Sequence, residues 1–122
     1  MELLEYVPNA SWLGLLMLIG IVSDTHGQVD LMRQVVRMFE SLQVELVIHC
    51  GDIGPATIVE LFEPWPAHFV LGNCDDRIRL PAAIRAADQT CHGRFGSLEL
   101  EGKKIAFLHG DDHALLHKTV KE

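Results

Sequence analysis

Five side chains able to bind a divalent cation are spread along this chain, and each follows an apolar segment. They are Asp24, His26, Asp52, Asn73 and His109. Carboxylate, imidazole and amide-oxygen donors suit Mn²⁺, Fe²⁺, Zn²⁺ or Ni²⁺ better than a metal that prefers thiolates. A carboxylate such as Asp52 can bridge two ions, and two ions ~3.5–4 Å apart can activate a hydroxide and bind a phosphoryl group. The residue types therefore predict a metal centre suited to attack on phosphorus.

The segments that must position these side chains alternate between strands and helices. Short apolar runs that end in polar turns predict strands, and amphipathic patterns between them predict helices. The predicted strands cover residues 18–23, 45–50, 67–71, 95–100 and 104–108, and the predicted helices cover residues 30–42, 56–62 and 77–88. This alternation is typical of an α/β layered domain. Because ligands of open α/β sheets bind beyond the carboxyl ends of the strands, the five side chains should meet at one edge.

Local signals refine these elements. Gly102 is expected in a hairpin turn, and Pro55 in the first turn of the helix over residues 56–62. Asp111 is expected to be the N-cap of a last helix that runs to the end of the chain. Apolar residues at helical spacing in the segment 30–42 are expected to face the core; they are Leu31, Val35, Met38, Phe39 and Leu42.

Composition and charge exclude several classes of function. The chain has 122 residues, 48% of them hydrophobic, which is enough for one domain with a core. A net charge of −7 with scattered basic residues argues against nucleic acid as a partner. Three cysteines without a CxxC pair argue against a disulfide framework and favour the cytoplasm.

The apolar run at residues 12–22 is shorter than the ~20 residues that a membrane span needs. Acidic rather than basic residues precede it, which is unlike a signal peptide. We therefore expect no membrane association. Residues 1–16 are interpreted as an N-terminal extension, and we hypothesise that translation begins at Met17, directly before the first predicted strand.

Four blocks of sequence around the candidate ligands form an ordered set: SDTHG (23–27), HCGDIG (49–54), LGNCD (71–75) and LHGDD (108–112). In this order they resemble the successive blocks of calcineurin-like metallophosphoesterases, and most of all the small bacterial and archaeal phosphodiesterase branch. The resemblance runs from Met17 to the end of the chain.

The resemblance implies a set of roles for the site residues. Asp24 and His26 would bind a first metal ion, Asp52 would bridge two ions, and Asn73 and His109 would bind the second. Asn73 would also bind the substrate phosphate, and a metal-bound hydroxide would hydrolyse a small phosphodiester or phosphomonoester. The implied cofactors are two divalent ions, with manganese first and nickel, zinc or iron as alternatives. The implied fold is a two-sheet β-sandwich flanked by helices.

The chain departs from the family pattern in two places. Many members have a histidine general acid where this chain has Cys74, although cysteine is common in the small phosphodiesterase branch. The family ends in a Gly-His-X-His block that supplies one further ligand to each metal, and the sequence stops before it. Residues 17–122 are therefore expected to be a partial domain without its C-terminal strands. A partner or a second copy would cover the incomplete sheet. His113 and His117 could replace the missing ligands, but a surface position on the last helix is the favoured interpretation.

Simpler interpretations remain for each site residue. Asp24 could cap a helix, and His26 could be a surface loop residue. Asp52 could serve only its turn, Asn73 could adopt a left-handed turn conformation, and His109 could be an ordinary strand-end histidine. His49 is expected to be packed or to orient a ligand by a hydrogen bond. For the whole protein, the alternatives to an enzyme are a non-catalytic interaction scaffold and an inactive truncated product.

Overall fold

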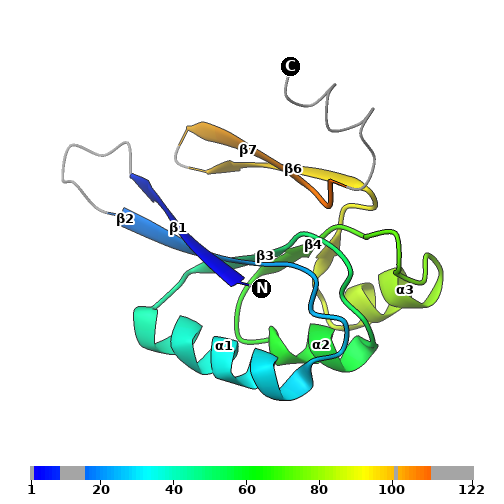
Figure 1. Cartoon of the computed structure of the whole chain (residues 1–122). Helices are drawn as coiled ribbons and strands as arrows, with labels where there is room; N and C mark the ends of the chain where they lie inside the picture. Colours follow the sequence, from blue (N-terminus) through cyan, green and yellow to red (C-terminus); the bar gives the residue numbers. More distant parts are fainter. Residues whose placement is uncertain (1, 9–15, 101, 111–122) are drawn as a thin grey trace.

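The computed structural model describes residues 2–8, 16–100 and 102–110, and for residues 2–8, 16 and 17 it describes the backbone alone. A five-stranded sheet forms the middle layer of the described domain (Figure 1). The three helices cover one face of this sheet, and a two-stranded hairpin lies over the other face (Figure 1). The α/β layered fold predicted from the sequence is confirmed.

The main sheet has the order β1-β2-β3-β4-β5. Strands β2 (Leu16–Val22), β3 (Leu46–His49), β4 (Ala67–Phe69) and β5 (Thr90–Cys91) run parallel, while β1 (Glu2–Pro8) pairs antiparallel with β2. Parallel strands bury both faces, which explains their continuous apolar sequences. Their carboxyl ends lie at one edge, where the loops that carry the candidate ligands begin.

The helical layer packs against strand residues that point to one face of the sheet. The helices are α1 (Val29–Leu42), α2 (Ala56–Leu61) and α3 (Arg79–Ala86). Phe39 of α1 is fully buried against strand β2, where Gly20 makes room for its ring. A methyl group at Gly20 would lie 2.5–2.8 Å from three ring carbons of Phe39, so this glycine permits the close approach of helix and sheet.

The predicted core face of α1 was partly wrong. Val35 and Phe39 are buried as expected, but Leu31 and Leu42 are 44% and 40% exposed, and Met32 is fully buried instead. The helix is rotated so that Met32, Val35 and Phe39 form the inward stripe, because the large Phe39 ring has to enter the space above Gly20. Leu31 precedes this stripe by one position and turns toward solvent.

The second layer is the hairpin of β6 (Phe95–Leu100) and β7 (Lys103–Leu108), paired antiparallel. Gly102 lies in its turn with φ 75°, as predicted. Phe107 packs against apolar residues on the second face of the main sheet; these are Ile19, Leu46, Ile48 and Val70. This small second core fixes the hairpin over the sheet, and β7 ends near the loops that follow β2 and β3.

Two strands, β1 and β5, were not among the predicted elements. The helix predicted from Asp111 onward, with His113 and His117, lies outside the described residues. Pro55 is the N-cap of α2 and directly precedes its first residue, one position before the expected one. Across the part of the chain that the structure describes, no helix combines the length and the hydrophobicity needed to cross a membrane.

Candidate metal centre

Backbone hydrogen bonds join the loops that follow β2 and β3. The amide of Cys50 donates to the carbonyl of Val22 at 2.8 Å, continuing the sheet pattern by one residue. The amide of Asp24 then donates to Gly51 at 2.9 Å, and that of His26 to Asp52 at 3.1 Å. The two loops therefore leave the sheet side by side, and this brings the first two candidate ligands next to the third.

Three of the candidate ligands have left-handed backbone conformations. Asp24, His26 and Asp52 have φ values of 56°, 44° and 54°. A non-glycine residue in this region costs on the order of 1 kcal/mol, and such residues concentrate at functional sites. The other two described cases, Gln43 and Asp88, lie at the ends of helices, where a left-handed residue is ordinary. Asp24 does not cap α1, whose N-cap is Gln28.

Asp52 lies at the centre of the cluster formed by the five candidate ligands. Its Oδ2 atom is 3.1 Å from Nε2 of His109 and 3.5 Å from Nε2 of His26. The Oδ1 atom of Asp24 is 3.7 Å from His26 Nε2 and 3.8 Å from His109 Nε2. The Asp52 side chain is 7% exposed, whereas Asp24 and His26 are about half exposed. The cluster therefore has a buried carboxylate and an open side that a substrate could reach.

The side chain of Asn73 also faces Asp52. In the orientation that satisfies both of its polar atoms, the Asn73 amide nitrogen donates to Asp52 Oδ1 at 3.2 Å and to Oδ2 at 3.3 Å. Asn73 is not among the residues with positive φ, so the left-handed turn considered from the sequence is wrong.

The donor atoms form two overlapping groups that could each hold a metal ion. One contains Asp24, Asp52 and His109, the other His26, Asp52 and Cys74, and within each group the ligand atoms lie within 4.8 Å of one another. Asp52 belongs to both, which is the geometry that a bridging carboxylate requires. The donor set therefore fits two divalent ions. The grouping differs from the one that the family resemblance implies, which paired Asp24 with His26.

A backbone carbonyl orients the ring of His109. Its Nδ1 atom lies 3.0 Å from the carbonyl oxygen of Cys50, so Nδ1 carries the proton and donates. The other ring nitrogen, Nε2, faces Asp52 at 3.1 Å and Asp24 at 3.8 Å. A metal-binding histidine commonly has this arrangement, with its second nitrogen bonded to a carbonyl or carboxylate. His109 thus has the strand-end hydrogen bond of the simpler interpretation and a free nitrogen at the cluster.

The two cysteines near the cluster differ in their surroundings. Burial, followed by the negative charge of Asp24, raises the pKa of the Cys50 thiol to about 11. The Asp52 carboxylate raises the pKa of the exposed Cys74 thiol. Both cysteines are therefore neutral thiols in the protein without metal. The Cys74 backbone amide also donates to Asp52 Oδ1 at 3.1 Å, so the loop after β4 holds the Asp52 carboxylate.

Two glycines allow these loops to approach each other. A methyl group at Gly72 would overlap the Asp52 Oδ1 atom and would lie 2.5 Å from its amide nitrogen. A methyl group at Gly51 would lie 2.9 Å from the His109 ring and from the Gly72 amide. The packing of the ligand loops therefore requires glycine at these two positions.

The sequence indicated no role for two buried polar residues behind the cluster, Thr25 and Asp75. Asp75 is 9% exposed and accepts hydrogen bonds from the amides of Ile53 at 2.9 Å and Gly72 at 2.9 Å. Thr25 and Asp75 stand inside the blocks SDTHG and LGNCD, which was the only available signal for them. Their partners come from other loops, and spacing along the chain does not reveal them.

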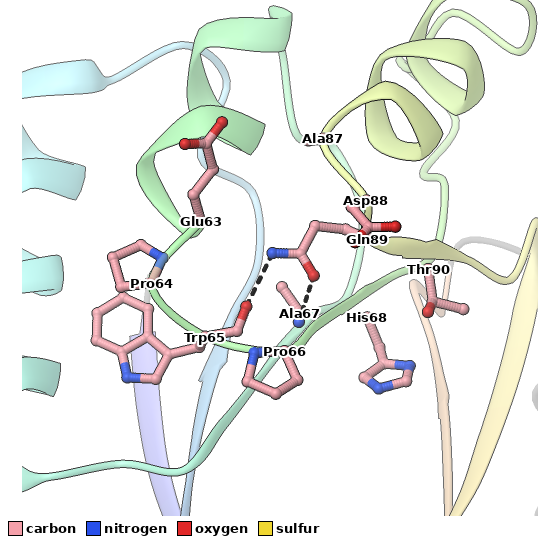
Figure 2. A pocket seen from close by; sticks show the side chains of 10 residues that line it. All are labelled: Glu63, Pro64, Trp65, Pro66, Ala67, His68, Ala87, Asp88, Gln89 and Thr90. Atoms are coloured by element: carbon pink, nitrogen blue, oxygen red, sulfur yellow. Dashed lines mark hydrogen bonds between the residues drawn. The ribbon is translucent and has the colours of Figure 1, made fainter.

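A hollow of about 440 Å³ lies away from the ligand cluster, at the opposite edge of the sheet. It lies between the segments that lead into β4 and β5 (Figure 2). Its central polar residue, Gln89, accepts from the Ala67 amide at 2.9 Å and donates to the Trp65 carbonyl at 2.8 Å (Figure 2). Those bonds engage the Gln89 amide in holding the two segments together. We therefore place the chemistry at the ligand cluster and not at this hollow.

Comparison with known proteins agrees with the geometry. Residues 17–122 match the calcineurin-like phosphoesterase superfamily domain, and the protein belongs to that superfamily. The phosphodiesterase MJ0936 of Methanocaldococcus jannaschii is 31% identical over 109 residues, which are 86% of this chain and 66% of that protein. The probable metallophosphoesterase YsnB of Bacillus subtilis is 38% identical over 55 residues, covering 45% of this chain and 31% of the relative.

Solved structures show the same fold. An archaeal phosphodiesterase structure superimposes with a TM-score of 0.75 at 30% identity, covering 84% of this chain and 65% of that one. The phosphoesterase Yfce from E. coli has a TM-score of 0.60 at 20% identity, covering 76% of this chain and 57% of that one, and supports the fold alone. The chain spans slightly less than two thirds of MJ0936 and of the archaeal phosphodiesterase.

Proposed function

We propose that this protein is a metal-dependent phosphoesterase that hydrolyses small phosphodiesters at a two-metal site. The observation that carries the proposal is the position of Asp52, which belongs to two groups of donor atoms at once. Similarity to proteins named phosphodiesterase and metallophosphoesterase supports the same reaction class. Because the chain spans only part of those relatives, the activity of the whole protein is also part of the proposal.

We assign the metal ligands to Asp24, His26, Asp52, Asn73 and His109, with Asp52 bridging. Carboxylate, imidazole and amide donors support Mn²⁺ as the native ion, with Ni²⁺, Zn²⁺ and Fe²⁺ as alternatives. When bound, the ions would activate water and neutralise charge that develops on the phosphoryl group. The three cysteines in the described residues are free, which supports a reducing, cytoplasmic location.

The protein's own side chains would position the substrate. Asn73 lies at the exposed side of the Asp52 carboxylate, where its amide nitrogen could donate to a phosphoryl oxygen. The His109 ring is 11% exposed and is hydrogen-bonded to the Cys50 carbonyl. It would exclude water from the Asp52 side of the site. The half-exposed Asp24 and His26 leave the other side open to the attacking water and to substrate.

A small cavity beside the ligand loops supports a small substrate. It has a volume of about 240 Å³ and lies between the loop after Asp52 and the start of α3; it is lined by Gly54, Pro55, Ala56, Asp76, Arg79 and Leu80. Gly54 packs directly on the Gly27 backbone, so the cavity begins next to the first ligand loop. Its lining is largely apolar and carries two charged side chains, Asp76 and Arg79, of which the Arg79 guanidinium could pair with the negative charge of an ester substrate.

The proposal is tested by hydrolysis of a chromogenic phosphodiester, bis(p-nitrophenyl) phosphate, by the purified protein with Mn²⁺ and with chelator. Asp52→Asn should abolish turnover. Asp30→Asn, a change of the same kind on a fully exposed aspartate of α1, should leave it unchanged. Turnover that persists in chelator or in Asp52→Asn would refute a metal reaction centred on Asp52. A folded protein without turnover would favour the scaffold or truncated-product alternative.

A further inference from the structure

Both backbone polar groups of Ile53, the residue directly after Asp52, are held by side chains from other loops. The Thr25 hydroxyl donates to the Ile53 carbonyl at 2.6 Å. The Ile53 amide donates to Asp75 Oδ1 at 2.9 Å. The Ile53 side chain is itself completely buried. The position of Asp52 is therefore fixed from one side by the first ligand loop and from the other by the third.

The Thr25 hydroxyl has a second partner, His49, and the direction of every bond in this chain can be assigned. The Gly51 amide donates to Nδ1 of His49 at 3.1 Å, so Nδ1 is unprotonated and Nε2 carries the hydrogen. Nε2 lies 3.1 Å from Thr25 Oγ1 and donates to it. The Thr25 hydrogen is then committed to the Ile53 carbonyl. Burial lowers the pKa of His49 to about 3, which keeps the ring in the neutral form that this chain needs.

Aromatic packing fixes the orientation of the His49 ring. The ring stacks on Phe69 at a centroid distance of 5.8 Å with an interplanar angle of 21°. Phe62 meets it edge-on at 6.4 Å. With both ring nitrogens bonded and both flanks packed, His49 cannot turn away from Thr25 without breaking buried contacts. Thr25 is fully buried as well, so water cannot replace either partner.

Asp75 completes the chain on the far side of Asp52. Its carboxylate accepts from the backbone amides of Ile53, Gly54 and Gly72, at 2.9, 3.3 and 2.9 Å. These bonds connect the loop after β3 to the loop after β4, which carries Asn73. The buried chain thus crosses all three ligand loops that leave the main sheet, and in each loop it touches a residue at or near a ligand.

We infer that Thr25 and Asp75 are positioning residues for the metal centre, which hold Asp52 in register with the ligands of the neighbouring loops. Thr25 stands between Asp24 and His26, both in left-handed conformations that need external support. Its hydroxyl accepts from His49 and donates to Ile53, so Thr25 acts on the metal centre through these two partners. The inference rests on the proposed metal function and adds to it the residues that set metal affinity.

The test is the affinity for Mn²⁺, measured by calorimetry, together with the melting temperature of the metal-free protein. Thr25→Val keeps the shape of the side chain and removes the hydroxyl, and Thr25→Ser restores it. We expect Thr25→Val to weaken Mn²⁺ binding by about 10- to 100-fold, the range for loss of an outer partner of a metal ligand. Thr25→Ser should recover most of the affinity.

Gln89→Leu is the matched control, because it also breaks buried side-chain bonds to the backbone but lies at the opposite edge of the sheet. It should lower the melting temperature and leave Mn²⁺ affinity unchanged. The inference is overturned if Thr25→Val binds Mn²⁺ like the wild type, or if Gln89→Leu weakens binding to the same extent. If Thr25→Val does not fold, Asp75→Asn tests the same arrangement from the other side and should weaken binding similarly. A wild-type protein that binds no Mn²⁺ would instead refute the proposed function itself.

Discussion

The Nε2 atom of His109 lies 3.1 Å from Oδ2 of Asp52, although the two residues come from different sheets. His109 follows the hairpin strand β7, and Asp52 follows β3 of the main sheet. The packing of Phe107 on the second face of the main sheet brings the end of β7 to this point. The hairpin is therefore part of the candidate site, and its attachment to the sheet positions one of the proposed ligands.

We predict that His109→Ala greatly reduces metal binding. The variant loses a ligand, so the fall in Mn²⁺ affinity should exceed the about 10- to 100-fold loss typical of outer partners. Calorimetric titration with Mn²⁺ measures it. His68→Ala is the control, since it removes another partly buried histidine, whose ring contacts His92 at 2.9 Å and not the cluster. Equal affinity of the two variants would contradict the assignment of His109.

Gly72→Ala should disable the site while the rest of the fold persists. The added methyl group would overlap Asp52 Oδ1, so the bridging carboxylate has to move away from the other ligands. We expect Mn²⁺ affinity to fall by about tenfold or more. Activity toward the chromogenic diester should fall in parallel. Unchanged metal binding would mean that Asp52 can shift without leaving its position between the two donor groups.

Gly20→Ala makes the same substitution beneath the ring of Phe39, away from the candidate ligands, and should affect stability alone. The methyl group would press on Phe39, and overpacking of this kind costs about 1–3 kcal/mol in the free energy of unfolding. Urea denaturation in the presence of chelator measures this loss. Its Mn²⁺ affinity, determined well below the unfolding transition, should match that of the wild type.

Arg79→Ala should raise KM for the phosphodiester with little change in kcat. The guanidinium lines the cavity next to the ligand loops, and an exposed charge pair contributes up to about 1 kcal/mol, which corresponds to about a fivefold change. Arg85→Ala is the control, because Arg85 is an exposed arginine in the last turn of the same helix and does not line the cavity. Steady-state kinetics in which both variants match the wild type would exclude Arg79 from substrate binding.

The free energy of unfolding should decrease as the pH is lowered, because of His49. Burial lowers the pKa of His49 from 6.5 to about 3. Below pH 6.5 the unfolded chain therefore binds a proton that the folded protein does not bind. The stabilising contribution is complete above pH 6.5 and is lost as the pH falls toward 3, at up to about 1.4 kcal/mol per pH unit. Urea denaturation at pH 4.5–7.5 should show a steeper decline for the wild type than for His49→Gln, which cannot titrate. Parallel curves would contradict a neutral, buried His49.

The sequence was sufficient to identify the candidate ligands because each stands at the end of an apolar run. The topology of the sheet then brings these run ends together. Asp24, Asp52 and Asn73 follow parallel strands whose carboxyl ends share one edge. Their convergence needed no knowledge of side-chain rotamers. His109 was also found in this way, because the hairpin pattern around Gly102 is local and strong.

What the sequence could not reveal depends on contacts between distant segments. Thr25 meets His49 and Ile53 across loops, and no periodicity relates these positions. Strand β5 has two residues, too few to give an alternating pattern. The rotation of α1 was missed because Leu31 and Met32 are both apolar, and only the space above Gly20 decides which residue turns inward.

Strand β1 has a consequence for the behaviour of the molecule in solution. Its residues Glu2–Pro8 pair with all of β2, from Val22 to Leu16, and satisfy the outward-facing N–H and C=O groups of that strand. In a chain shortened to residues 17–122, β2 would become the edge strand, and those groups would be available for hydrogen bonding to other protein molecules. An open strand of this kind is a template for intermolecular pairing, and natural proteins avoid leaving one uncovered. Pairing with the first strand therefore covers an edge of the sheet that could otherwise support self-association.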